Sequence, residues 1–186
     1  MRSKKSCSAI VAALVVVIAN MVLANMVVAS LAAQQAAPAS SGAGSGELLL
    51  QARAYHDPVH LTIGELKALP HITVTIHNSH TNADETYTGV RLADLLGKVG
   101  VPLGSELRGK ALANYVVATG SDGYQATLAL GEIDPTFHPG EVLVADTMDG
   151  KPLDAHSGPL KLVVTEDKRP ARSVRNLTAI ELKSAQ

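Results

Sequence analysis

The sequence predicts an α+β fold: a β-rich domain built on a mixed sheet, with two or three short helices. Short apolar runs recur at intervals of roughly eight to twelve residues with turn residues between them, a spacing typical of β-sandwiches and barrels. Helical periodicity is confined to a few short segments. No long alternation of strands and helices occurs, so a doubly wound parallel sheet is not expected.

Residues 1–32 are predicted to form an export signal. An apolar run from Ile10 to Val28 follows Arg2, Lys4 and Lys5, and Ser30-Leu31-Ala32 supplies the small residues that a signal peptidase reads. The run is close to the length that spans a bilayer, so an uncleaved membrane anchor is the alternative. The basic segment contains no arginine pair, which favours export of an unfolded chain to the periplasm or the medium.

Residues 33–46 are predicted to be a flexible linker, because they consist of Ala, Gln, Ser, Gly and Pro without any charge. The remaining residues, 47–186, have the length of one domain with a sizeable core.

Charge and cysteine content exclude several functions. The chain has 16 Lys and Arg against 17 Asp and Glu, a net charge of −1, and three of the basic residues lie in the predicted signal. A nucleic-acid partner is therefore not expected. The single cysteine, Cys7, also lies in the predicted signal. The domain is expected to have no disulfide, cysteine nucleophile or thiolate metal ligand.

The first half of the domain shows a strand, a helix and a second strand. Residues 47–54 form an apolar run, and Thr62 with Glu65 makes a capping box for a helix that Pro70 ends. Residues 71–79 alternate between apolar and polar side chains, as expected of a half-buried strand. A polar loop is predicted over residues 77–85.

The second half predicts one more helix and several hairpins. Apolar residues at helical spacing indicate a helix from Leu92 to Val99. Residues 111–119 and 124–130 read as two strands joined by a turn. Further strands follow between 141 and 182, where Asp149-Gly150 suits a two-residue type I′ turn.

Three motifs together resemble the molybdopterin-binding domain of the sulfite oxidase family. They are Gly89-Val90-Arg91-Leu92, Asp122-Gly123-Tyr124 and Asp149-Gly150-Lys151-Pro152-Leu153, and the similarity extends over most of residues 61–182. The resemblance implies a β-dominated α+β fold, a molybdopterin cofactor and an oxidoreductase activity.

The resemblance also implies site residues. Ser173-Val174-Arg175 corresponds to the segment that holds the pterin phosphate. His156 corresponds to the polar residue before the family's Gly-x-Pro-Leu-Arg motif, and Lys161 replaces the arginine of that motif. His77 and Asn78 stand where the family has its molybdenum-binding cysteine. No cysteine is present there, and neither imidazole nor amide replaces the soft sulfur ligand that molybdenum requires.

Two main hypotheses follow for the function. The first is an exported oxidoreductase of the sulfite oxidase type that lacks the usual cysteine; its redox partner and substrate are not predicted. The second is a metal-free binding module of the same fold, for a small anionic ligand or a partner protein. A weaker third is a copper or zinc site at His77 and His80. Arg172 and its basic neighbours form either an anion site or a solvated surface.

Overall fold

The computed structural model describes residues 46–185, all of which fall within one compact unit. The predicted signal and almost all of the predicted linker lie outside the described residues. Within residues 46–185, no helix is long and apolar enough to cross a membrane.

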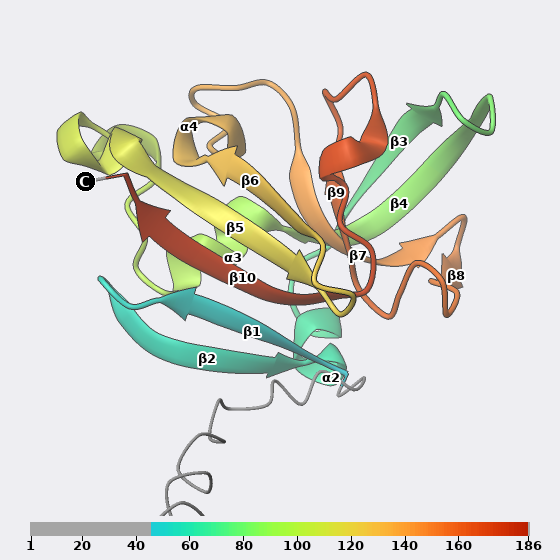
Figure 1. The fold of residues 1–186 in the computed structure, drawn as a ribbon, viewed down its shortest axis with the longest axis horizontal. Helices are drawn as coiled ribbons and strands as arrows, with labels where there is room; N and C mark the ends of the chain where they lie inside the picture. The colour runs from blue at the N-terminus through green and yellow to red at the C-terminus, as the bar shows by residue number, and fades with distance from the viewer. Residues whose placement is uncertain (1–45, 186) are drawn as a thin grey trace, which may run out of the picture. The chain divides into compact units, whose positions relative to one another are not determined.

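Two five-stranded sheets form the framework (Figure 1). Sheet A has the order β2-β1-β10-β5-β6. Its strands are β1 (Glu47–Ala52), β2 (His56–Thr62), β5 (Asn114–Gly120), β6 (Gln125–Ala129) and β10 (Leu177–Ser184). The pairing of β1 with β10 is parallel and the other pairings are antiparallel, so the sheet is mixed. This confirms the predicted mixed sheet.

Sheet B is antiparallel and has the order β3-β4-β7-β8, with β9 also paired to β7. Its strands are β3 (Ile72–Asn78), β4 (Ala83–Arg91), β7 (Val142–Met148), β8 (Lys151–Pro152) and β9 (Lys161–Val164).

The helices are short, as the sequence predicts. They are α2 (Ile63–Lys67), α3 (Leu92–Lys98) and α4 (Leu130–Ile133), with 3-10 turns η1 (Gly104–Glu106), η2 (Gly109–Ala113) and η3 (Pro170–Arg172). The capping box is present at α2: Thr62 Oγ1 accepts from the Glu65 amide at 3.2 Å, and Glu65 Oε2 accepts from the Thr62 amide at 2.8 Å.

One hydrophobic core joins the two sheets and α3. Leu50 of β1, Val116 of β5 and Ile180 of β10 meet Leu95 of α3 and Leu162 of β9 in this core, and each side chain is at most 1% exposed. A smaller cluster of Tyr87, Leu143, Ala145 and Val163 belongs to sheet B alone. Sheet B therefore has buried side chains on both faces.

Turn chemistry fixes the hairpins. Asp149 and Gly150 have φ values of 50° and 73°, the left-handed conformations that a type I′ turn requires. Asp149 Oδ1 also accepts from the Thr86 amide at 3.0 Å. At the β5–β6 turn, Asp122 Oδ1 accepts from the Tyr124 amide at 2.9 Å. Asp122 thus closes its own turn, whereas Asp149 ties the β7–β8 turn to β4.

Two predictions of local structure were incomplete. The polar loop predicted over residues 77–85 is shorter, because β3 continues to Asn78 and β4 starts at Ala83. Strand β2 was not predicted, because its sequence His56-Asp57-Pro58-Val59 is polar and contains a proline. Such a sequence suits an edge strand, and β2 lies at the edge of sheet A.

Candidate functional site

The small cluster on sheet B marks one face of that sheet, which we call the Tyr87 face. Val74 of β3 pairs with Tyr87 of β4, and Ala145 of β7 pairs with Lys161 of β9. A β-bulge leaves Asp146 unpaired between β4 and β7 and brings Met148 opposite Tyr87. Alternation along each strand therefore gathers these side chains on one side of the sheet.

Lys161 lies against Tyr87 at the centre of this face. Its ammonium nitrogen donates to Tyr87 Oη at 2.6 Å and sits 4.5 Å from the centre of the ring. The contact combines a hydrogen bond with a cation–π interaction. Tyr87 is 1% exposed, whereas Lys161 is half-buried.

Glu85 and Asn78 extend the contact into a chain of hydrogen bonds. Tyr87 Oη donates to Glu85 Oε2 at 2.7 Å, and Asn78 Nδ2 donates to Glu85 Oε1 at 2.6 Å. Because the tyrosine hydrogen points to Glu85, the tyrosine oxygen is left to accept from Lys161. The order is Asn78, Glu85, Tyr87, Lys161.

This environment changes two pKa values. Burial lowers the pKa of Lys161; the Glu85 carboxylate opposes this, and the Arg175 guanidinium adds to it. Burial also raises the pKa of Tyr87, together with its hydrogen bond to Glu85. The phenol therefore stays neutral, and the lysine loses its proton more readily than a solvated lysine does.

Arg175 and His156 reach the same place from two other segments. Residues 173–177 run beside β9, where the Leu162 amide donates to Val174 O at 2.8 Å. The Arg175 guanidinium contacts His156 Nε2. Asn176 fixes the loop that carries His156, since its Nδ2 donates to His156 O at 3.0 Å. We call Lys161, Tyr87, Glu85, Arg175 and His156 the Lys161 cluster.

The other predicted site residues lie elsewhere. Ser173 is buried, and its Oγ accepts from the Val164 amide at 3.4 Å. Val174 is 0% exposed in the main core. His77 belongs to the opposite face of β3, where its Nδ1 pairs with Asp84 Oδ1 at 2.9 Å. Of the seven predicted residues, the structure thus brings together His156, Lys161 and Arg175, with Asn78 joined to them through Glu85 and Tyr87.

Arg172 does not join the Lys161 cluster. It binds Asp167 at 2.6 Å and Glu132 at 2.8 Å, so its charge is neutralised by two carboxylates. Metal-ligating side chains do not cluster either: residues 46–185 contain no group of three or more His, Cys, Asp or Glu that could hold a metal ion.

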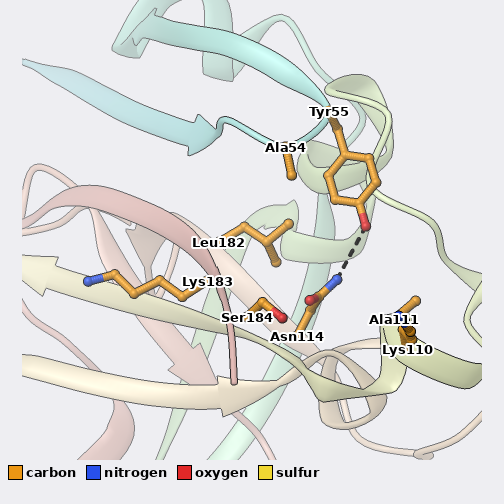
Figure 2. Close-up of a pocket in the computed structure, with 8 residues that line it drawn as sticks. All are labelled: Ala54, Tyr55, Lys110, Ala111, Asn114, Leu182, Lys183 and Ser184. Carbon is orange, nitrogen blue, oxygen red and sulfur yellow. Dashed lines mark hydrogen bonds between the residues drawn. The ribbon is translucent and has the colours of Figure 1, made fainter. Parts of the chain in front are cut away.

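A pocket of about 300 Å³ lies at one end of sheet A, lined by Tyr55, Asn114 and Lys183 among others (Figure 2). Tyr55, Asn114 and Lys183 already have partners within the protein. Asn114 Nδ2 donates to Tyr55 Oη at 3.3 Å, and Lys183 pairs with Glu181 at 3.1 Å while its chain extends away from Tyr55 (Figure 2). Because most of its polar side chains are already paired, this pocket is a weaker indication of a binding site than the Lys161 cluster.

Sequence reasoning missed Tyr87 and Glu85. Both lie in the alternating stretch that leads to Gly89, so a sequence signal for one shared face existed. The contact with Lys161 depends on the pairing of β4 with β7 and of β7 with β9, over 74 residues of chain. Strand alternation alone cannot supply that pairing.

Comparisons with known proteins identify the family and agree with the fold. The family model described as "Oxidoreductase molybdopterin binding domain" matches residues 49–186. The crystal structure of the sulfane dehydrogenase SoxCD from Paracoccus pantotrophus is similar in fold, with a TM-score of 0.58 and 17% sequence identity. That match covers 75% of this chain and 39% of the SoxCD chain. No match was found among curated proteins. The chain therefore belongs to the oxidoreductase molybdopterin-binding domain family.

Proposed function

We propose that the protein is an exported binding module of this family that holds a small anionic ligand at the Lys161 cluster. The observation that carries the proposal is the meeting of His156, Lys161 and Arg175, which come from separate segments of the chain. Arg175 is exposed, and its contact with His156 leaves other guanidinium N–H groups to face a ligand. Export is supported by the basic and apolar segments of residues 1–32.

The family implies a molybdopterin, and the residues present fit only part of that group. A guanidinium beside an imidazole and an ammonium suits a phosphate. The metal is not matched: His77 is paired with Asp84, Asn78 with Glu85, and residues 46–185 include no cysteine. Molybdenum is held by soft sulfur ligands. We therefore derive no step through molybdenum, and an oxidoreductase activity rests on the family membership alone.

Calorimetry with pyridoxine 5′-phosphate, a compact phosphate monoester, tests anion binding. Arg175→Met is expected to weaken binding at least about tenfold, because a charge-assisted hydrogen bond contributes roughly 1.5–3 kcal/mol. Lys98→Met is the matched control, since Lys98 is an exposed lysine at the end of α3, away from the Tyr87 face. Equal affinity of both variants, or no binding by the unaltered protein, contradicts the proposal.

Metal analysis of the protein purified from its native host tests the other half of the proposal. The expected result is no stoichiometric molybdenum. One molybdenum per chain, accompanied by pterin fluorescence, would show a loaded oxidoreductase and overturn the metal-free module.

A further inference from the structure

The geometry points to Lys161 as a nucleophilic amine that forms an imine with the carbonyl group of an anionic ligand. This inference rests on the proposed function, because Arg175 must hold the anionic group of that ligand. It adds a substrate class: small aldehydes or ketones that also carry a phosphate or carboxylate.

The position of Lys161 is suited to this chemistry. A lysine becomes nucleophilic when it is desolvated or lies beside a second cation, because both effects favour the neutral amine. Lys161 has both features: it is half-buried against the Tyr87 ring, and the Arg175 charge acts on it. The Glu85 and Asp154 carboxylates oppose the effect, and the cation–π contact with the Tyr87 ring also favours the ammonium.

The hydrogen-bond chain provides a route for the proton. Lys161 donates to Tyr87 Oη, which donates to Glu85 Oε2. Lys161 can pass a proton to the tyrosine oxygen while the tyrosine passes its own to Glu85. The lysine becomes a neutral amine, Glu85 becomes a carboxylic acid, and Tyr87 is unchanged.

The reaction balances without an external oxidant or reductant. The amine lone pair forms a C–N bond to the carbonyl carbon, and a proton moves from nitrogen to oxygen to give a carbinolamine. The acid proton on Glu85 returns through Tyr87 to that hydroxyl group, and the C–O bond breaks. Water leaves, a protonated imine remains on Lys161, and Glu85 is again a carboxylate.

Borohydride trapping tests the inference. The full chain is treated with pyridoxal 5′-phosphate, the aldehyde counterpart of pyridoxine 5′-phosphate, reduced with sodium borohydride and mapped by peptide mass spectrometry. Lys161 is expected to be labelled at least about fivefold faster than exposed Lys151, because a desolvated amine is more reactive. Labelling of Lys161 at or below the rate of Lys151 overturns the inference.

Two variants test whether labelling of Lys161 depends on the proton route or only on the accessibility of its amine. Glu85→Gln keeps the side-chain shape but removes the proton acceptor, and loss of a general base slows a reaction by about a hundredfold or more. Loss of the Glu85 charge also favours the neutral amine and offsets part of this, so labelling of Lys161 is expected to slow about tenfold, with Lys151 unchanged. Tyr87→Phe is a second variant that breaks the same route if Glu85→Gln unfolds. Unchanged labelling of Lys161 in folded variants removes Glu85 and Tyr87 from the mechanism and overturns this assignment.

The two proposals fail differently. If the protein binds pyridoxine 5′-phosphate but Lys161 is not labelled selectively, the imine proposal is wrong and the anion site is retained. If Lys161 reacts selectively with propanal, a neutral aldehyde, but the protein does not bind pyridoxine 5′-phosphate, then the anion site fails. With both intact, Arg175→Met slows labelling by pyridoxal 5′-phosphate more than labelling by propanal, because propanal loses only the effect of the Arg175 charge on Lys161.

Discussion

At the scale of single residues, the Lys161 cluster depends on one hydroxyl group. Tyr87 Oη accepts from Lys161 and donates to Glu85, so both charged groups share it. Removing the oxygen leaves a partly buried ammonium and carboxylate without that common partner.

Tyr87→Phe is therefore expected to lower the free energy of unfolding by about 1–3 kcal/mol, because lost hydrogen bonds to charged groups cost that much. Urea denaturation measures the effect. In a double-mutant cycle, Lys161→Met should cost less in the Tyr87→Phe background than alone, since the two side chains interact directly. Additive costs would show that the contact contributes nothing to stability.

A second residue makes stability depend on pH. Asp134 is 1% exposed. Burial raises its pKa, but bonds from Thr136, with Oγ1 at 2.7 Å and the amide at 2.8 Å, and from the Gly104 amide outweigh this. The pKa is held below its ordinary value of 3.8. The folded protein thus favours the carboxylate.

The sign of the effect follows from linkage. The stabilisation from Asp134 is complete above pH 3.8 and is lost as the pH falls through the lower folded-state pKa. We expect the free energy of unfolding of the unaltered protein to decrease over this acid range. Asp134→Asn should be less stable at neutral pH and should show a shallower decrease. Parallel curves for the two proteins would contradict the assignment.

At the scale of elements, the β-bulge brings β4 and β7 unusually close at Gly89. A Cβ atom at this position would lie 2.5 Å from Ala145 Cα, and it would also overlap Val144 O. Both are backbone atoms, so no side-chain movement can relieve the overlap. The glycine of the Gly89-Val90-Arg91-Leu92 motif is therefore explained by strand packing.

Gly89→Ala is expected to destabilise the protein by about 3 kcal/mol or more, at the upper end of overpacking costs. Gly97→Ala is the control: Gly97 lies exposed in α3 with open space around its Cα, so alanine should stabilise by roughly 0.5–1 kcal/mol. Thermal unfolding followed by circular dichroism measures both. Equal effects from the two substitutions would refute the explanation of Gly89.

Features that depend on neighbouring residues could be predicted from the sequence, whereas the pairing of distant strands could not. The Thr62 capping box and the Asp149-Gly150 turn each depend on residues at most three apart in the sequence, and both are present in the structure. Ser173 was assigned to the site with Arg175, but Ser173 and Val174 are both buried, and the Ser173 hydroxyl accepts from the Val164 amide of β9. The contact of Tyr87 with Lys161 required a sheet order that no local pattern encodes.

At the scale of the whole molecule, both sheets share one core, so they should unfold together. Ile180 is fully buried on β10, between Leu50 of β1 and Ala118 of β5. Ile180→Ala is expected to cost about 2–5 kcal/mol. Hydrogen exchange should rise in β4 and β7 of sheet B as much as in β1. Increased exchange confined to sheet A would show that the two sheets unfold independently. Thr127→Ala, a substitution at an exposed position on β6, is the control and should not change hydrogen exchange in either sheet.

The position of β10 also sets the timing of folding during synthesis. Among the strands of residues 46–185 this strand is made last, yet it lies between β1 and β5 (Figure 1). The β1–β2 hairpin therefore has no partner in the sheet until residues 177–184 have left the ribosome, and two-stranded hairpins are marginal in water. The two halves of sheet A, β2-β1 and β5-β6, therefore stay unjoined until β10 has been made and has entered between them.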